Sequence, residues 1–127
     1  MGLPLGASLA VYNEQIAGTV GLRKVEEGIF EFTKMAVGKD FRKKGIGEAL
    51  VYSSFKKAEQ LGAVKIILYS NKKNEAAIRL YAKIGFTHLP VEQGVYKRAN
   101  VKMMIDISTA IEASNLYEIK SQLQYQL

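Results

Sequence analysis

A basic loop followed by two glycines is the part of the sequence best suited to bind a ligand. It reads Met35-Ala36-Val37-Gly38-Lys39-Asp40-Phe41-Arg42-Lys43-Lys44-Gly45-Ile46-Gly47. A helix that begins at the glycines would have N–H groups without partners at the positive end of its dipole, and glycine lets an anion approach the backbone. The segment therefore predicts a phosphate-binding turn with Arg42, Lys43 and Lys44 at its rim. The alternative is a tight strand-to-helix turn without a ligand.

Other chemistries find little support in the sequence. The dinucleotide-binding pattern needs a third glycine where Leu50 stands, and the P-loop sequence Gly-Lys-Ser/Thr does not occur. The protein has no cysteine, and His88 is its only histidine. Disulfides and thiolate metal sites are therefore excluded, and a histidine zinc site or a Ser-His-Asp triad has little to build on. We expect no metal, and we expect His88 to be an exposed surface residue.

Positive charge is unevenly placed along the chain, whose net charge is +6. Nine basic residues lie between positions 39 and 73, against three acidic ones. Such a region attracts a nucleic acid or a small phosphorylated ligand, or it is simply a solvated surface. No aromatic stacking motif accompanies the charge, so the sequence does not favour a nucleic acid as the partner.

Hydrophobic periodicity predicts the elements that must position this loop in one α/β domain. Strands are expected at 8–12, 16–25 and 29–37, a helix at 45–60, a strand at 64–69, a second helix ending at Gly85, strands at 86–91 and 96–107, and a helix from 108 onward. In the third strand, Phe30 and Phe32 should face opposite to Glu31, Thr33, Met35 and Val37. The order predicts a mixed, mostly antiparallel sheet flanked by helices.

Two motifs resemble those of the GNAT superfamily of acyl-CoA-dependent N-acyltransferases. Residues 42–47 fit its acyl-CoA signature Gln/Arg-x-x-Gly-x-Gly/Ala, and residues 74–86 fit its pattern Asn-x-x-Ala-x-x-Leu-Tyr-x-x-x-Gly-Phe at every fixed position. The resemblance covers residues 8–106 and implies a GNAT-like fold that binds acetyl-CoA as co-substrate. The implied contacts to CoA are the strand residues Met35, Ala36 and Val37, the loop and helix start Arg42, Lys43, Lys44, Gly45, Ile46 and Gly47, and the helix residues Asn74 and Tyr81.

The resemblance also implies catalytic residues for transfer of the acyl group to an amine. Tyr81 corresponds to the family's general acid for the leaving thiolate, although a tyrosine that simply packs in the core would fit the same stripe. Glu31 matches by spacing the general base of some relatives, but a relayed water could serve instead, or Glu31 could be a solvent-facing strand residue. Asn74 could contact CoA, cap the second helix, or do both. The backbone N–H near Val37 would contact the oxyanion. Tyr96 and Arg98 would border the acceptor site, or either could be a plain strand residue.

The chain departs from the family pattern at both ends. Relatives usually carry a strand and two helices before the segment equivalent to 8–12, and these are lacking here, where seven residues precede it. Residues 107–127 instead form an extra C-terminal helix after a core of residues 1–106. We expect Thr109 and Glu112 to form its capping box, and Ile111, Leu116, Ile119, Leu123 and Leu127 to lie on or near one side. The chain could be a piece of a longer protein, the helix could fill the vacated space, or a second copy could cover it in a homodimer.

The sequence thus predicts an N-acetyltransferase that works by direct attack in a ternary complex, since no cysteine is present to carry an acyl intermediate. The alternative is a non-catalytic acyl-CoA-binding module that has lost its acceptor site. No apolar run is long enough to span a bilayer and no convincing signal peptide begins the chain, so we expect a cytoplasmic protein that has no membrane partner.

Overall fold

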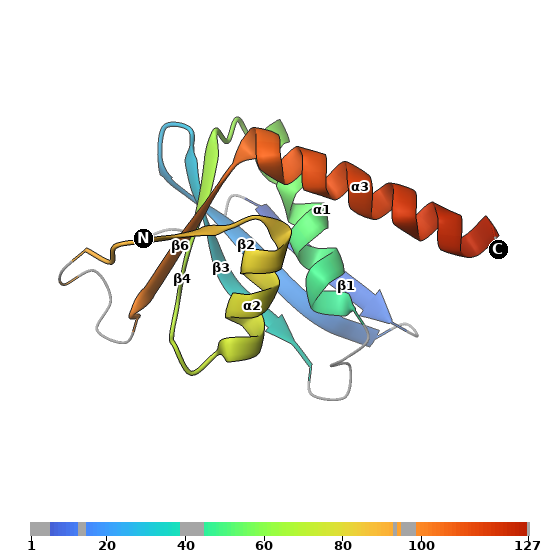
Figure 1. The fold of residues 1–127 in the computed structure, drawn as a ribbon, viewed down its shortest axis with the longest axis horizontal. Helices are drawn as coiled ribbons and strands as arrows, with labels where there is room; N and C mark the ends of the chain where they lie inside the picture. Colours follow the sequence, from blue (N-terminus) through green and yellow to red (C-terminus); the bar gives the residue numbers. More distant parts are fainter. Residues whose placement is uncertain (1–5, 13–14, 39–44, 93, 95–98, 127) are drawn as a thin grey trace.

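Six strands form one sheet in the computed structural model, which describes residues 6–12, 15–38, 45–92, 94 and 99–126. The strands are β1 (Gly6–Tyr12), β2 (Gln15–Glu26), β3 (Ile29–Val37), β4 (Lys65–Ser70), β5 (Thr87–Leu89) and β6 (Val101–Asp106). The helices are α1 (Ile46–Gln60), α2 (Glu75–Ile84) and α3 (Ile107–Gln126). The predicted order of elements is confirmed, and most boundaries fall within one or two residues of those expected (Figure 1).

The sheet has the order β1-β2-β3-β4-β6-β5, and its only parallel pair in the described part is β3 with β4. A parallel pair needs a crossover connection, and here α1 provides it. The other neighbours pair antiparallel, which confirms the mixed, mostly antiparallel sheet that the sequence predicts. No helix in the described residues is long and apolar enough to cross a membrane.

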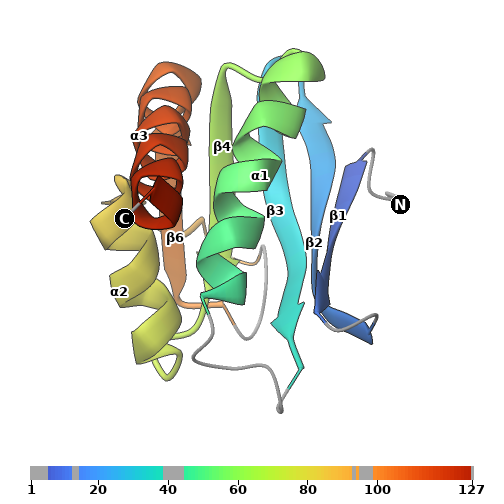
Figure 2. The same ribbon diagram turned by 90° about the vertical axis from the view of Figure 1, so that its right-hand side faces the viewer.

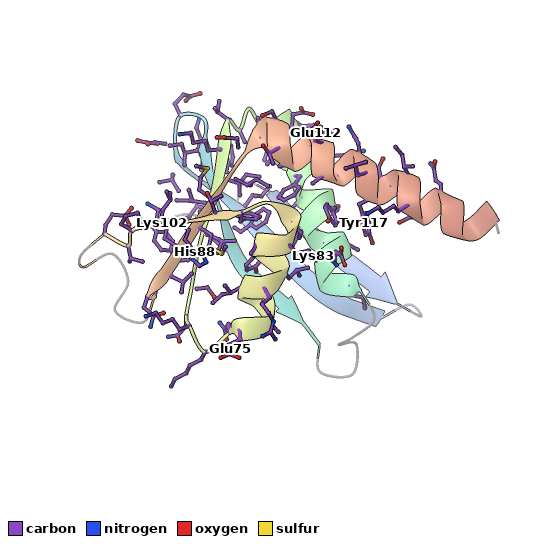
Figure 3. The ribbon with its side chains drawn as sticks, viewed as in Figure 1. Glu75, Lys83, His88, Lys102, Glu112 and Tyr117 are labelled. Carbon is purple, nitrogen blue, oxygen red and sulfur yellow. The ribbon has the colours of Figure 1, made fainter. Side chains whose placement is uncertain are left out.

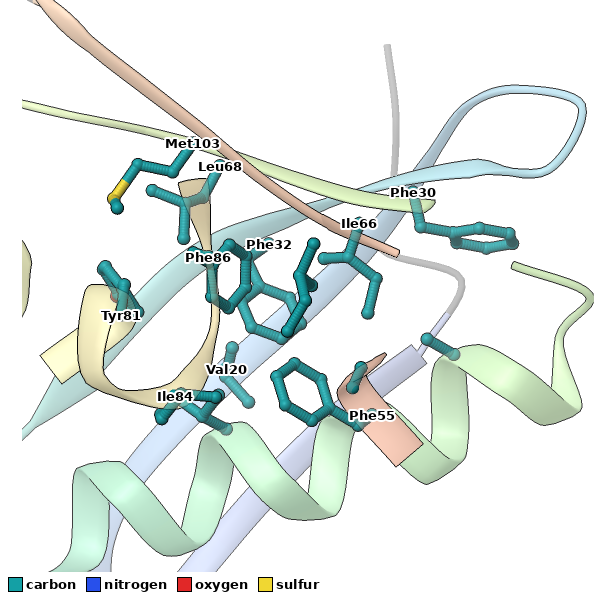
Figure 4. Packing of buried hydrophobic residues seen from close by; sticks show 14 of the residues in the cluster. Val20, Phe30, Phe32, Phe55, Ile66, Leu68, Tyr81, Ile84, Phe86 and Met103 are labelled. Carbon is teal, nitrogen blue, oxygen red and sulfur yellow. The ribbon is translucent and has the colours of Figure 1, made fainter. Parts of the chain in front are cut away.

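All three helices pack on one face of the sheet (Figure 2). The core between the layers is built around Phe32, whose ring stacks on Phe55 of α1 at 5.9 Å and tilts against Phe86 at 6.0 Å (Figure 4). Such aromatic pairs each contribute about 0.5–1.5 kcal/mol beyond the burial of their area. Phe30 and Phe32 both face this core, as the alternation of β3 predicts.

Two β-bulges change the register between β2 and β3. Val25 is an extra residue on β2, between the pairs Glu26↔Ile29 and Lys24↔Phe30. On β3 an extra residue lies between Thr33 and Ala36. Strict alternation along β3 is therefore interrupted after Thr33, and the predicted orientations of Met35 and Val37 lie outside the described side chains.

Strands β3 and β4 pair only over their first residues. The ladder runs from Ile29↔Lys65 to Phe32↔Leu68, whereas β3 continues to Val37 and β4 to Ser70. Beyond the last pair the two strands separate, and the sheet is open between them (Figure 1 and Figure 2).

Helix α3 packs on α1, beside α2. Tyr117 stacks on Tyr52 of α1 with ring centroids 4.3 Å apart, and Ser114 Oγ donates to the Tyr52 carbonyl at 3.2 Å. Ala110, Ser114 and Tyr117 recur at helical spacing, so this small, partly polar face is the one that is covered. The sheet face opposite the helices bears no helix of the described chain, and α3 therefore does not fill a bare face there.

Two expectations for this helix are corrected. It begins at Ile107, directly after β6, so Thr109 lies inside its first turn and cannot be the N-cap of a capping box. Ile111 of the predicted apolar stripe packs against the core, but Leu116 is 56% exposed and Ile119 is 53% exposed, so the prediction is wrong for these two residues. Leu123 and Leu127 lie outside the described side chains. That residues 1–106 form a separate core stays a prediction.

The two sides of α3 should respond differently to a buried charge. Ala110→Asp should lower the free energy of unfolding by at least about 3 kcal/mol, because Ala110 is fully buried. Ile119→Asp, the matched change on the exposed side, should cost less than about 1 kcal/mol, which reflects helix propensity alone. Urea unfolding measures the free energy of unfolding of both variants, and sedimentation measures their oligomeric state. A large loss of stability or of a dimer in Ile119→Asp would show that the outer stripe is covered after all.

Candidate functional site

A hollow of about 660 Å³ lies where β3 and β4 separate. Phe32 and Leu68, the last paired residues of the two strands, line it from the sheet. The loop after β4 is short, so it brings the first turns of α2 to the same place, and residues 73–77 and Tyr81 complete the wall. The hollow therefore exists because the strands part and α2 begins there.

Tyr81 reaches the hollow from α2 and is only 7% exposed. Its ring packs against Phe86, with centroids 5.5 Å apart, so Tyr81 is also part of the core. Burial raises the pKa of Tyr81 to about 12, because the phenolate would have to be desolvated. The phenol therefore stays protonated through the neutral and mildly alkaline range and can donate a proton into the hollow.

Asn74 lines the same hollow at the start of α2. It occupies the N-cap position, and its carbonyl accepts the first helical hydrogen bond from the Ile78 N–H at 3.0 Å. Its side chain makes no capping bond; the amide nitrogen instead donates to Ser70 Oγ at 3.4 Å. The capping alternative therefore applies to the backbone of Asn74 and not to its side chain.

The start of α1 has the geometry expected of an anion-binding turn. Gly45 has φ +75°, a left-handed conformation that favours glycine, and a Cβ there would meet no atom within 4 Å. Ile46 and Gly47 are the first helical residues, so their N–H groups have no acceptor within the helix. Arg42, Lys43 and Lys44 lie outside the described residues. Met35, Ala36 and Val37 are the last residues of β3, in the stretch that no longer pairs with β4; on the other side of β3, Ala36 and Val37 pair with β2.

Glu31 lies on the other face of the sheet, one residue before the strands part. It is 6% exposed, so the expectation of a solvent-facing strand residue is wrong. Arg23 of β2 is its direct cross-strand partner, and Arg23 Nη2 donates to Glu31 Oε1 at 2.5 Å. The contact is a charge-assisted hydrogen bond between a half-buried guanidinium and a buried carboxylate.

Sequence reasoning missed Arg23 because of the bulge at Val25. Counting back from the turn after Glu26 without a bulge would place Lys24 opposite Glu31. The extra residue shifts the register by one, so Arg23 takes that place and Lys24 contacts Glu27 at the hairpin end, at 2.9 Å. The only signal in the sequence was the presence of two adjacent cations near the turn.

A second polar cluster joins β4 to the segment after β5. The Tyr69 hydroxyl donates to Glu92 at 2.8 Å, and Lys102 of β6 contacts the same carboxylate and lies 5.5 Å from the Tyr69 ring centroid. The bonds from Lys102 and Tyr69 lower the pKa of Glu92 to about 2. This cluster ties residue 92 to the sheet beside the hollow, since Tyr69 also lines the hollow. His88 is exposed, as expected (Figure 3), and Tyr96 and Arg98 lie outside the described residues.

One buried side-chain oxygen near Glu31 has no hydrogen-bond partner among the residues that the structure describes. It is the hydroxyl oxygen of Thr33, the first β3 residue beyond the last pair with β4. A buried hydroxyl without a partner costs about 1–3 kcal/mol of folding free energy.

Among the described residues, no three His, Cys, Asp or Glu side chains gather as a metal ion would require.

The arrangement can support proton transfer on both sides of one strand. A protonated phenol lies on the helix side of β3, at the hollow, and a buried carboxylate lies on the opposite side, at the same level of the strand. Such a pair can give a proton to a leaving group and take one from a nucleophile that meets it at the opening.

Comparisons with known proteins agree with this geometry. The sequence matches the family model described as the acetyltransferase (GNAT) family over residues 3–86. It is 28% identical over 74 residues to mycothiol acetyltransferase of Corynebacterium efficiens, covering 58% of this chain and 25% of that protein. It is also 28% identical over 94 residues to the uncharacterized N-acetyltransferase YobR of Bacillus subtilis, covering 74% and 37% of the two chains. The chain thus spans a quarter of the length of the first of these curated relatives and a little over a third of the second.

A solved acetyltransferase from Bacillus subtilis, in complex with CoA, superposes with a TM-score of 0.69 at 26% identity. The alignment covers 79% of this chain and 75% of that one. The two chains thus share a fold over most of their length. From the family match, the two motifs and this fold, the chain belongs to the acetyltransferase (GNAT) family.

Proposed function

We propose that the protein transfers an acetyl group from acetyl-CoA to an amine, in one step within a ternary complex. The observation that carries the proposal is the hollow at the separation of β3 and β4, into which Tyr81 presents a phenol held protonated by burial. Membership of the family and the CoA complex of a structural relative support acyl-CoA as the donor.

In this proposal the backbone binds most of the donor. The first N–H groups of α1, beside Gly45 and Gly47, hold the pyrophosphate at the positive end of the helix dipole. Residues 35–37 of β3, which do not pair with β4, offer main-chain groups on that side to the pantetheine arm, as an added strand would use them. The thioester then lies in the hollow between Asn74 and Tyr81.

The chemical step moves one acyl group and one proton. The neutral amine nitrogen attacks the thioester carbon, and the carbonyl oxygen becomes an oxyanion that the Val37 N–H stabilises. The C–S bond breaks, and Tyr81 donates its proton to the leaving thiolate. Before the attack Glu31, directly or through water, removes one proton from the protonated amine and releases it to solvent. After the attack the nitrogen loses a second proton, which restores Tyr81 by way of solvent. A base matters because an alkyl amine with a pKa of about 10.4 is almost fully protonated at neutral pH.

The glycine turn can be tested without disturbing the helix. Gly47→Leu should lower acetyl-CoA affinity by at least about 30-fold, because a bulky side chain at the second helical residue would obstruct the pyrophosphate. Leucine is a better helix former than glycine, so the free energy of unfolding should not fall. Gly47→Ala is the matched control and should bind acetyl-CoA nearly normally. Calorimetric titration measures all three proteins, and wild-type affinity in Gly47→Leu would refute the phosphate-turn assignment.

Tyr81→Phe should separate chemistry from binding. The phenylalanine keeps the packing against Phe86 but removes the proton donor, so turnover should fall by about 10²-fold. The acetyl-CoA dissociation constant should change by less than about threefold. Steady-state kinetics and calorimetry together measure the two effects. Unchanged turnover would leave Tyr81 with a packing role only.

The pair Arg23–Glu31 requires a double-mutant cycle. If Glu31 is the base, Glu31→Gln should lower the rate by about 10²-fold near neutral pH, and the loss should shrink as the pH approaches the pKa of the amine. The double variant Arg23→Gln with Glu31→Gln should show the same pH-dependent loss, because the base is still missing. A double variant that regains wild-type activity, or a loss in Glu31→Gln that is equal at every pH, would make the pair a structural cross-strand contact.

The amine itself is best found by measuring CoA release with a panel of simple amines, polyamines, aminoglycosides and peptide N-termini. We expect at least one to be acetylated. Tight binding of acetyl-CoA without release of CoA for any amine would favour the non-catalytic binding module over the enzyme.

A further inference from the structure

A second cavity lies beside a different face of helix α2 from the hollow. We name it the α2–β5 pocket; its volume is about 370 Å³, and the residues that line it include Lys72, Glu75, Ile78, Arg79, His88 and Val101. This volume is within the range of small-molecule sites, about 300–1,000 Å³. Among the described residues that line the two cavities, Glu75 is the one that they share. The pocket is therefore a separate space, next to the hollow at the start of α2.

The pocket lies at the edge of the sheet, on the side that carries the helices. His88 of the edge strand β5 stands directly opposite Met103 of β6, and Met103 is fully buried in the core. Opposed residues of an antiparallel pair point to the same face, so His88 is on the helix side of the sheet (Figure 3). Ile78 and Val101 both take part in the core packing, and they give the pocket an apolar floor.

One wall of the pocket is held by main-chain hydrogen bonds. The Lys72 N–H donates to Asn100 Oδ1 at 2.8 Å, and the Asn100 N–H donates to the Ser70 carbonyl at 3.1 Å. Lys72 and Asn100 both line the pocket. These bonds join the loop after β4 to the residue before β6, so this wall is formed before any ligand binds.

Two opposite charges in the pocket are spaced to pair but do not pair. Glu75 and Arg79 are four residues apart on α2, with the acidic residue first, which is the order that favours an ion pair on a helix. Neither of them forms an ion pair with another described residue, and neither does Lys72. Lys102, which also lines the pocket, is by contrast engaged with Glu92. The described part of the pocket thus offers two cations and one carboxylate to a ligand.

This set of charges matches a free α-amino acid, which carries a carboxylate and an ammonium group on one carbon atom. A guanidinium can hold a carboxylate through two parallel hydrogen bonds, so Arg79 suits the carboxylate and Glu75 suits the ammonium. Lys72 adds positive charge, which further favours the carboxylate. A phosphate would be repelled by Glu75, and a simple amine would be repelled by the two cations. The floor of Ile78 and Val101 suits an apolar side chain.

We propose that the α2–β5 pocket binds a free α-amino acid with an apolar side chain, and that this ligand is an effector of acetyl-CoA binding. The effect follows from Glu75, which lines both cavities. A bound ammonium offsets the charge of Glu75, and acetyl-CoA is an anion, so each ligand should strengthen the binding of the other. The effector role rests on the proposed function, because it needs acetyl-CoA in the hollow, whereas the amino-acid site does not.

The site is tested by titrating the full chain with L-leucine while following the backbone amide resonances of residues 75–79 and 87–89. These signals should move with a dissociation constant of about 1 mM or lower, which a ligand of this size can reach. Leucinamide lacks the carboxylate and 4-methylpentanoate lacks the ammonium, so each should bind at least about tenfold more weakly. Glycine lacks the apolar side chain and should also bind at least about tenfold more weakly. Signals that do not move with L-leucine would refute the site, whatever acetyl-CoA does.

The variant Arg79→Met distinguishes the pocket from a general effect of charge. It keeps an unbranched side chain at an exposed position but removes the guanidinium, so L-leucine affinity should fall at least about tenfold. Leucinamide, which has no carboxylate, should bind no more weakly than it binds to the wild type. The matched control is Lys83→Met, one turn further along α2 and outside the pocket, which should bind L-leucine like the wild type. Equal L-leucine affinity in Arg79→Met and the wild type would refute the site.

The effector role is tested by calorimetric titration of acetyl-CoA with and without saturating L-leucine. Acetyl-CoA should bind about threefold more tightly in its presence, as expected for one exposed charge that is offset, and this gain should vanish in Arg79→Met. Unchanged acetyl-CoA affinity, or acetylation of L-leucine itself, would overturn the effector role. Failure to bind acetyl-CoA, with L-leucine still bound in the pocket, would refute the proposed function and leave the amino-acid site standing.

Discussion

The separation of β3 from β4 after the pair Phe32↔Leu68 is the constraint on which the site depends. A sheet that paired to the strand ends would have no hollow and no unpaired main-chain groups beside it. The strands can part because the core between the sheet and the helices still holds β3 in place. Phe32, at the end of the ladder, packs against Phe55 of α1 and Phe86 after α2. The aromatic core thus holds the sheet together just where its hydrogen bonds stop.

The separation also explains why two kinds of polar residue meet at one strand. Tyr81 approaches from the helical layer, where burial keeps its phenol protonated. Glu31 lies on the opposite face, which carries no helix of the described residues, and it pairs there with Arg23. Each group is stable in its own environment, a neutral phenol in the core and a charged carboxylate beside a guanidinium. The opening between the strands is the place where one substrate could contact both.

Much of the fold could be predicted from the sequence, because the signals are local. Alternation along β3, helical spacing in α1 and the glycine after α2 each depend on a few neighbouring residues, and they gave the order of elements correctly. The partner of Glu31 could not be predicted, because a single bulged residue, Val25, decides whether Lys24 or Arg23 stands opposite. The packing of α3 was also mispredicted. Its leucine and isoleucine stripe is the stronger hydrophobic signal, yet the smaller face with Ala110 and Ser114 can approach α1 closely enough for Tyr117 to stack on Tyr52.

The central claim is that the acyl donor binds where β3 and β4 part, and backbone amide chemical shifts on addition of acetyl-CoA test it most directly. The account predicts the largest shift changes in three separate stretches: residues 33–37 beyond the last β3–β4 pair, residues 45–48 at the start of α1, and residues 74–81 around the hollow. The paired hairpin end around residues 24–29 should change little. Changes centred on that hairpin or on β5, with residues 33–37 and 74–81 unaffected, would contradict the account.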